Sequence, residues 1–261
     1  MSNKQGEFIW YELMSADPDA AKAFYDAVVG WTVEPRPSGP IGYRMIDTGQ
    51  GLVGGVMRLD EQMRKNGARP AWLGYLGIDD VDDAAERVRA AGGSVHVPPT
   101  DIPSVGRFAL LADPQGAPFY VMRGASDGTS TAFSPETPGH VAWNELATPD
   151  LDGALGFYAE QFGITEGGRM PMGEMGDYVF LHHGGRPIGA AMKRRPDAHP
   201  SPWTFYFHVP DLDRSTEAVR AGGGQVLHGP APVPGGSRII VALDPEGAIF
   251  GLVSPDQGAS A

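Results

Sequence analysis

An internal repeat that runs through most of the chain constrains the fold more than any other feature. Residues of the first half recur in the second at separations of 131 to 133 positions and keep their order. The matching pairs are Trp10 with Trp143, Glu12 with Glu145, Asp17 with Asp150, Trp72 with Trp203, Tyr75 with Tyr206 and Asp113 with Asp244. An ordered series of this kind indicates a tandem duplication.

The two copies meet at a segment with the composition of a linker. Residues 124–138 read GASDGTSTAFSPETP, which is small, polar and proline-containing. We therefore predict an N-terminal domain over residues 1–123, a linker over 124–138, a C-terminal domain over 139–255 and a tail over 256–261. A chain of 261 residues is long enough for two domains of ordinary size.

Each half is itself built from two similar parts. In each part a strand-like run ends in Asp, a helical pattern follows, and Gly closes it. The Asp can accept hydrogen bonds from the first helical turn, and the Gly can take the left-handed conformation that ends a helix. Helices are predicted over residues 17–30, 80–92, 150–163 and 211–222. In the second part, strands are predicted over 94–97, 107–112 and 119–123. The sequence thus predicts an α+β fold of four βαβββ modules.

Composition excludes several classes of protein. The chain has no cysteine, which removes disulfides, thiolate nucleophiles and cysteine-bound zinc. The net charge of -12 would repel phosphate backbones, so no nucleic-acid partner is expected. We find neither an apolar run long enough to span a membrane nor a basic and apolar leader at the start. The expected location is the cytoplasm.

The repeated modules resemble the vicinal oxygen chelate superfamily, which includes glyoxalases, bleomycin-resistance proteins and extradiol dioxygenases. The resemblance rests on Asp-(x)6-Phe-Tyr at 17–25 and 150–158, the run from Asp80 to Gly93, and the D-P-x-G-x-x-F hairpins ending at Phe119 and Phe250. It implies two glyoxalase-like domains, in each of which two modules form a cup-shaped mixed sheet around a small-molecule site. Within that superfamily, the sequence is most similar to the branch whose members have two domains in tandem.

The resemblance also locates where metal-dependent members carry their ligands. In this sequence those positions hold Trp10 and Trp143, Leu73 and Thr204, Tyr120 and Gly251, and the pairs Gly54-Gly55 and Gly189-Ala190. None of these is a good metal ligand. We therefore predict no metal and no other cofactor, with a divalent metal at an unorthodox position as the alternative.

Glu12 and Glu145 are the leading candidates for a chemical role. Each lies two residues after a tryptophan on a predicted strand, so the two side chains share a face. If that face lines the cup, the carboxylate enters an apolar cavity, where it can bind a ligand or act as a base. The alternative is a structural carboxylate hydrogen-bonded at a seam between modules.

Three further kinds of residue, histidine, tyrosine and tryptophan, complete the predicted site. His208 lies on a predicted strand and, with Glu145, could form an acid–base pair or a displaced metal pair; otherwise it is a structural histidine. Tyr75 and Tyr206 could donate to a ligand carbonyl or belong to the core. Trp10, Trp143 and Tyr120 are predicted to line the substrate site, with a place in the core as the alternative for the two tryptophans.

Two classes of function follow. The first is a soluble protein similar to tandem glyoxalases and bleomycin-resistance proteins, which holds a small organic molecule in a β-cup without the usual metal. The second is a lyase, isomerase, hydroxylase or oxygenase-type enzyme of the same superfamily that uses Glu145, Tyr206 and His208. The expected partner is a small molecule. The sequence leaves open its identity, and whether the chain is a monomer with fused domains or a homodimer.

Overall fold

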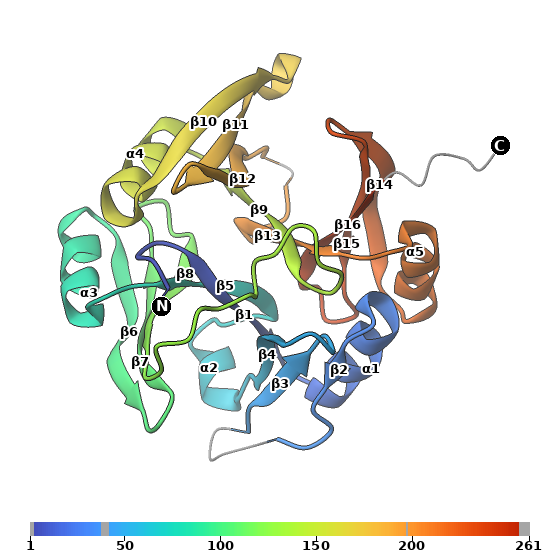
Figure 1. The fold of residues 1–261 in the computed structure, drawn as a ribbon, viewed down its shortest axis with the longest axis horizontal. Coiled ribbons are helices and arrows are strands. Elements are labelled where there is room, and N and C mark those ends of the chain that lie inside the picture. Colours follow the sequence, from blue (N-terminus) through green and yellow to red (C-terminus); the bar gives the residue numbers. More distant parts are fainter. Residues whose placement is uncertain (1–2, 38–41, 197, 256–261) are drawn as a thin grey trace. The chain divides into compact units, whose positions relative to one another are not determined.

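The chain folds into the four predicted βαβββ modules (Figure 1). The computed structural model describes residues 3–37, 42–196 and 198–255. The first module contains β1 (Phe8–Ser15), α1 (Pro18–Val29), β2 (Thr32–Val33), β3 (Arg44–Asp47) and β4 (Leu52–Arg58). The second contains β5 (Ala71–Gly77), α3 (Val81–Ala90), β6 (Ser94–Ile102), β7 (Gly106–Ala112) and β8 (Pro118–Gly124). The third contains β9 (Val141–Thr148), α4 (Leu151–Phe162), β10 (Ile164–Pro171), β11 (Asp177–His183) and β12 (Arg186–Lys193). The fourth contains β13 (Trp203–His208), α5 (Leu212–Ala221), β14 (Gln225–Val233), β15 (Ser237–Leu243) and β16 (Ile249–Pro255). Two short helices, α2 (Glu61–Lys65) and η1 (Gly173–Met175), lie between strands.

The helix boundaries follow from the predicted capping residues. The side chains of Asp17, Asp80, Asp150 and Asp211 accept hydrogen bonds from the first turns of α1, α3, α4 and α5. Helices α1 and α4 end on Gly30 and Gly163, both in the left-handed conformation. Helix α5 differs slightly from the prediction, because the left-handed residue is Gly223 and not Gly222. The sequence pattern therefore located all four helices to within a residue or two.

The strands form two mixed sheets of eight. The first has the order β2-β3-β4-β1-β5-β8-β7-β6, and the second has the equivalent order β10-β11-β12-β9-β13-β16-β15-β14. Within a module, the first strand pairs in parallel with the last strand, as β1 does with β4 and β9 with β12. The other pairs within each module are antiparallel. This arrangement confirms the α+β class and the repeat of one sheet per half of the sequence.

The chain groups into two compact units that do not coincide with the two sequence halves. Unit 1 contains Met1–Trp10, Leu73–Ser130 and Trp143–Trp203, whereas unit 2 contains Tyr11–Trp72, Thr131–Ala142 and Thr204–Ala261. Each unit therefore takes one module mainly from each half. The domain limits at 1–123, 124–138 and 139–255 stay a prediction, and the predicted tail at 256–261 lies outside the described residues.

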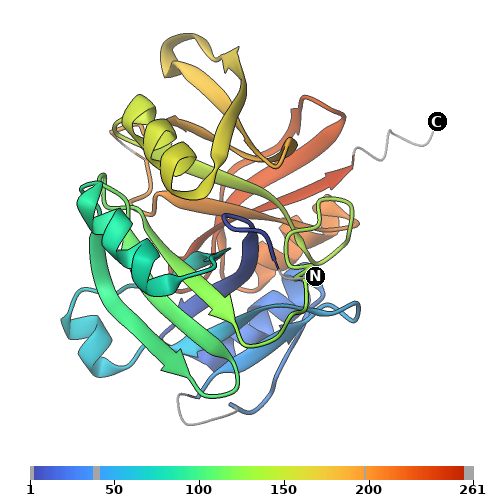
Figure 2. The same ribbon diagram turned by 60° about the vertical axis from the view of Figure 1, so that its left-hand side comes forward.

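Unit 1 shows how helix and sheet pack within a module. Helix α3 lies against β6 and β7 (Figures 1 and 2). Its buried side chains are Val81, Ala84, Ala85 and Val88, which share one helical face as the periodicity predicts. The face that α3 turns to solvent is charged, and the helix is therefore amphipathic.

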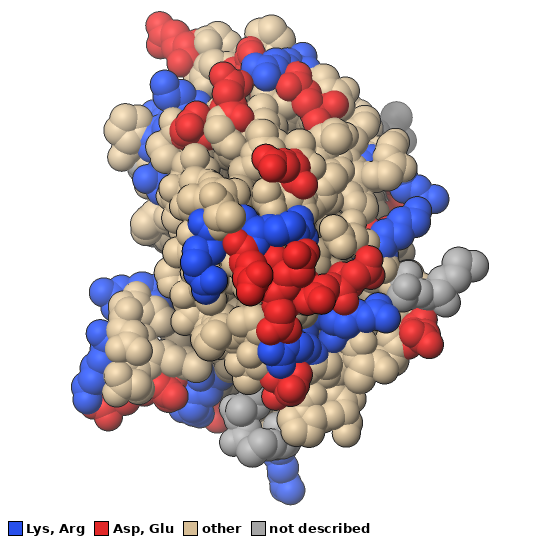
Figure 3. Space-filling view, turned by 90° about the vertical axis from the view of Figure 1, so that its left-hand side faces the viewer, with Lys and Arg blue, Asp and Glu red and all other residues tan. Residues whose placement is uncertain are grey.

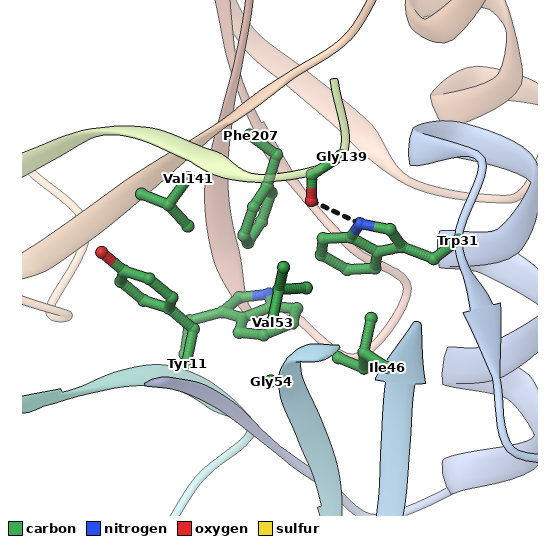
Figure 4. A pocket seen from close by; sticks show the side chains of 9 residues that line it. Tyr11, Trp31, Ile46, Val53, Gly54, Gly139, Val141 and Phe207 are labelled. Carbon is green, nitrogen blue, oxygen red and sulfur yellow. Dashed lines mark hydrogen bonds between the residues drawn. The ribbon is translucent and has the colours of Figure 1, made fainter. Parts of the chain in front are cut away.

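The core of unit 2 is aromatic and closely packed. Rings of Trp31 and Phe207 lie 4.7 Å apart, and those of Trp72 and Phe207 lie 4.9 Å apart. The indole of Trp31 donates a 2.7 Å hydrogen bond to the carbonyl of Gly139, which ties the residue directly after the predicted linker to this core (Figure 4). The narrow hollow between these rings leaves no space for a water molecule, so it is part of the core and not a ligand site.

A buried hydrogen-bonded chain joins the paired modules of unit 2. The indole of Trp72 donates to the hydroxyl of Tyr25 at 2.8 Å, and that hydroxyl donates to the Oδ2 atom of Asp244 at 3.1 Å. Unit 1 repeats the last step, since the Tyr158 hydroxyl donates to Asp113 at 3.2 Å. The repeated Phe-Tyr and D-P-x-G motifs therefore meet inside each unit and hold modules together.

Charged side chains are paired on the side of the molecule that carries α3 (Figure 3). Arg107 contacts Asp82 at 2.7 Å and Asp101 at 2.9 Å, and Arg87 contacts Asp83 at 2.8 Å. Acidic groups gather near the centre of this face with basic groups beside them, and the basic groups do not form one continuous surface. Within the described ranges, no helix combines the length and apolar composition needed to cross a bilayer.

Candidate functional site

The third module presents a half-buried face of its sheet. Side chains alternate along β9, so Asn144 and Leu146 are buried on one face while Trp143 and Glu145 are only half-buried on the other. Helix α4 packs against the same module's strand β12. Opposite Glu145 in the ladder lies Ala190 of β12, and opposite Ala190 lies Phe180 of β11. Trp143, Glu145 and Phe180 therefore share one face.

A hydrogen-bonded relay crosses this face. The indole N–H of Trp143 donates to the hydroxyl of Tyr178 at 2.8 Å. The Tyr178 hydroxyl in turn donates to the Oε2 atom of Glu145 at 2.8 Å. Burial, together with the charge of the Glu145 carboxylate, raises the pKa of Tyr178 well above its usual value. Tyr178 therefore stays protonated and acts as a donor to Glu145. We call Trp143, Tyr178 and Glu145 the relay.

The ring of Phe180 packs against the two aromatic members of the relay. The ring of Phe180 lies 6.3 Å from that of Trp143 and 5.7 Å from that of Tyr178, in both cases edge to face. The N–H of Trp143 and the O–H of Tyr178 are both used within the relay, so this face offers a ligand a carboxylate acceptor in apolar surroundings.

The relay joins two of the predicted site residues through one that the sequence reasoning missed. Trp143 and Glu145 were predicted, whereas Tyr178 and Phe180 were not. The signal was present in the alternation of the run DYVFLHH, where Tyr178, Phe180 and His182 fall on one face of a strand. Tyr178 also corresponds to Tyr43 of the first module, at a separation of 135 residues. The repeat was found at separations of 131 and 133 residues, and neither of these brings the two tyrosines together.

The predicted tyrosines lie in the interior. Tyr75 and Tyr120 are buried neighbours on β5 and β8 of unit 1, and their rings stack 4.2 Å apart. Tyr206 is buried in unit 2, where its ring covers Gly251 so closely that a Cβ atom there would lie 2.2 Å from it. The close approach of the Tyr206 ring thus explains why position 251 holds a residue without a side chain.

The remaining predicted residues lie in different units. Trp10 is half-buried in unit 1, whereas Glu12 is buried in unit 2, where it pairs with Gly55 of β4. Glu145 belongs to unit 1, while Tyr206 and His208 belong to unit 2. The predicted combination of Glu145, Tyr206 and His208 therefore stays a prediction.

His208 packs against the predicted linker. Its backbone pairs with both Gly139 and His140, and its ring bonds to the backbone of Pro135, where only a carbonyl is available. Burial lowers the pKa of His208, and the neighbouring Glu136 and His140 act on that pKa in opposite directions. These contacts place the imidazole at the seam between β13 and residues 135–140.

We expect the stability of unit 2 to fall as this histidine is protonated. A lowered pKa in the folded state means that the contribution of His208 is present above the pKa of the unfolded chain and is lost as pH falls through that of the folded state. Urea unfolding between pH 7 and pH 5 should therefore show a smaller loss of free energy in His208→Gln than in the unchanged protein. His96→Gln, at an exposed strand position, is the control. Equal pH dependence in His208→Gln and the unchanged protein would contradict the assignment of this loss of stability to protonation of His208.

The donor set of the described residues does not fit a resident metal ion. No three His, Asp or Glu side chains within the described ranges lie close enough together to hold one. At the family's ligand positions in the third module stand Trp143 and the pair Gly189-Ala190, beside the single carboxylate of Glu145. One carboxylate among aromatic rings is a poor set of ligands.

The four βαβββ modules and the two equivalent eight-stranded mixed sheets define the class of fold. The chain belongs to the Glyoxalase/Bleomycin resistance protein/Dioxygenase superfamily, which matches residues 8–121 and 137–252. Both halves of the sequence are therefore members, as the internal repeat predicts.

Relatives span nearly the whole chain. It is 34% identical over 254 residues to a putative glyoxylase, CFP32, of Mycobacterium tuberculosis, with 97% of this chain and 96% of the relative covered. It is 32% identical to the anthracycline biosynthesis protein DauV of a Streptomyces species, with 94% and 91% covered.

Solved structures share the fold at low sequence identity. The Mn(II)-bound glyoxalase of Novosphingobium aromaticivorans superposes with a TM-score of 0.63 at 20% identity, covering 96% of this chain and 82% of that one. The 2,2',3-trihydroxybiphenyl 1,2-dioxygenase of Sphingomonas wittichii superposes with a TM-score of 0.67 at 15% identity, covering 96% and 91%. These likenesses show the fold and do not extend to the chemistry.

Proposed function

We propose that the chain holds a small organic molecule against the half-buried face of its third module, without the metal ion that is usual in this superfamily. The observation that carries the proposal is the relay, which ends in a half-buried carboxylate among the rings of Trp143, Tyr178 and Phe180. An apolar wall with a few fixed polar groups is typical of small-molecule sites.

The relay also indicates which chemical groups the ligand must carry. Because the donors of Trp143 and Tyr178 are used within the relay, a ligand gains most by donating a hydrogen bond to Glu145. Its body would stack on or pack against the aromatic rings. A molecule that combines a flat apolar ring system with a hydroxyl or amino group meets both requirements. Two relatives are named anthracycline biosynthesis proteins, so an anthracycline belongs among the ligands to test.

The enzyme alternative rests on the same carboxylate. A half-buried Glu145 is suited to abstract a proton from a bound carbonyl compound, as in a lyase, isomerase or oxygenase-type reaction. The names of two relatives, putative glyoxylase and probable lactoylglutathione lyase, favour this class. A divalent metal at an unorthodox position would belong to this alternative.

A thermal-shift screen tests the proposal. The purified protein is heated with Mn²⁺, Zn²⁺, Fe²⁺ or Ni²⁺ alone, and separately with small carbonyl compounds, phenols, aromatic amines and an anthracycline. A ligand at a hundred times its Kd stabilises the folded state by about 2.7 kcal/mol, which raises Tm by several degrees. We expect a shift with a donor-bearing aromatic compound and none with metal alone.

The fate of the bound compound separates the two functions. Ligand recovered unchanged after prolonged incubation supports a binding protein, whereas a product identified by mass spectrometry supports the enzyme alternative. Stoichiometric metal in protein purified without added metal would overturn the metal-free proposal. If no organic compound raised Tm, the ligand-holding function would be wrong.

A further inference from the structure

The first and third modules carry the same carboxylate at the same place in the ladder. In the third module, Glu145 pairs with Ala190, and Ala190 pairs with Phe180. In the first module, Glu12 pairs with Gly55, and Gly55 pairs with Met45. Paired residues point to the same face of a sheet, so Glu12 and the Tyr43 side chain two residues before Met45 share one face.

The two ladders differ at the central position, which is glycine in the first module and alanine in the third. A Cβ atom built on Gly55 would lie 2.1 Å from Cε1, 2.3 Å from Cζ and 2.4 Å from the hydroxyl oxygen of Tyr43. The ring of Tyr43 therefore rests on the bare backbone of Gly55, directly beside the position of Glu12. Ala190 has a Cβ at the equivalent point, so Tyr178 cannot take that place.

The carboxylate beside the covered glycine is also the less exposed of the two. Glu12 is 2% exposed, whereas Glu145 is half-buried and reached by the hydroxyl of Tyr178. The neighbouring glycines do not explain this difference. Gly54 and Gly189 both lie close to the carbonyl of the adjacent first strand, that of Tyr11 or Asn144, and so play the same part in both modules.

We propose that Tyr43, seated on Gly55, closes the first module over Glu12, so that the third module alone is open to a ligand. The lack of a side chain at position 55 is what admits the tyrosine ring. Under the proposed function, on which this step rests, the chain then holds one ligand against Glu145 and none against Glu12. A change at Gly55 or Tyr43 would open a second site with the same carboxylate.

Chemical labelling of carboxylates tests the closure without any ligand. The native protein is treated with a water-soluble carbodiimide and glycine ethyl ester, and the rates of amide formation at Glu12 and Glu145 are measured by peptide mass spectrometry. We expect Glu145 to react about tenfold faster than Glu12 or more, since a covered group reacts only when its surroundings open. Gly55→Ala should raise the rate at Glu12 towards that at Glu145, because the Cβ displaces the tyrosine ring.

A second variant tests the same closure in another way, and a control variant shows that the effect is specific to the covered position. Tyr43→Ala removes the cover without adding an atom to β4, and should raise labelling of Glu12 as Gly55→Ala does. Leu52→Ala, at an exposed position of β4, should leave both rates unchanged. Equal labelling of Glu12 and Glu145 in the unchanged protein, or no rise at Glu12 in either variant, would overturn the closure. Because no ligand is used, this outcome is independent of whether the proposed function fails.

Discussion

Replacing either buried aspartate of the D-P-x-G turns should lower the free energy of unfolding by about 3 kcal/mol. In Asp244→Ala, two backbone N–H groups, of Glu246 and Ala248, lose the Oδ1 atom that accepts from them at 2.9 and 2.8 Å. The hydroxyl of Tyr25 loses its acceptor at the same time. Buried donors without partners are costly, so the loss exceeds that of an ordinary surface substitution.

Asp113→Ala offers the same test in unit 1. Asp113 accepts from the N–H groups of Gln115 and Ala117 and from the Tyr158 hydroxyl, in the same pattern as Asp244. Urea unfolding should show a similar loss for both variants. Asp127→Ala, at an exposed position, should change the free energy of unfolding by less than about 0.5 kcal/mol. A loss below about 1 kcal/mol in both turn variants would contradict the importance assigned to these turns.

The pH dependence of the free energy of unfolding tests the importance of these aspartates in a second way. Burial raises the pKa of both Asp113 and Asp244, although backbone and tyrosine hydrogen bonds act in the opposite direction. A raised pKa in the folded state favours the protonated form, so the associated stability is present below the pKa of the unfolded chain and is lost as pH rises through that of the folded state. Asp244→Asn should therefore lose less stability than the unchanged protein as pH rises from 4 towards neutrality.

These turns show why repetition in a sequence does not by itself separate structure from function. Asp113, Asp244, Tyr25 and Tyr158 belong to the repeated motifs that carry the resemblance to the family, and Glu145 also recurs, as Glu12, in the other half. In the structure they form buried bonds between modules, with Tyr25 and Asp244 separated by 219 positions. The local signals for helix caps and turns predicted the modules well, because capping and turn formation depend on neighbours in sequence. Which module packs on which depends on contacts between distant residues, and the sequence pattern carried no information on them.

The candidate site was predicted only in part for a related reason. Strand alternation was enough to place Trp143 and Glu145 on one face, and the structure confirms that placement. The relay needs Tyr178 from β11, and the register of β11 against β12 includes a shift near Leu181 and His182. A bulge of this kind changes which side chains lie opposite one another, and it leaves no clear mark in the sequence. Alternation alone puts Tyr178 and Phe180 on one face of β11, but it does not say which strand lies beside β11 or in which register, so it could not identify Tyr178 as the partner of Glu145.

Glu145→Gln should weaken binding of a ligand found in the thermal-shift screen by roughly thirtyfold, which corresponds to about 2 kcal/mol. The amide oxygen of glutamine can still accept from the Tyr178 hydroxyl, so the fold and the relay should survive. What is lost is the negative charge that strengthens a hydrogen bond from the ligand. Isothermal titration of both proteins measures the change directly, and equal circular dichroism and Tm values would show that the fold is intact.

Glu12→Gln is the matched control for this prediction, because it makes the same substitution at the equivalent position of the first module. Glu12 is buried and pairs with Gly55, over which the Tyr43 ring lies, so its replacement should leave affinity unchanged. An unchanged Kd in Glu145→Gln together with the loss of product formation would instead favour the enzyme alternative, in which Glu145 acts on a bound substrate as a base. If both affinity and turnover were unchanged, Glu145 would have no role in the site. The pair of variants therefore separates a carboxylate that holds the ligand from one that transforms it, and both from one that is only structural.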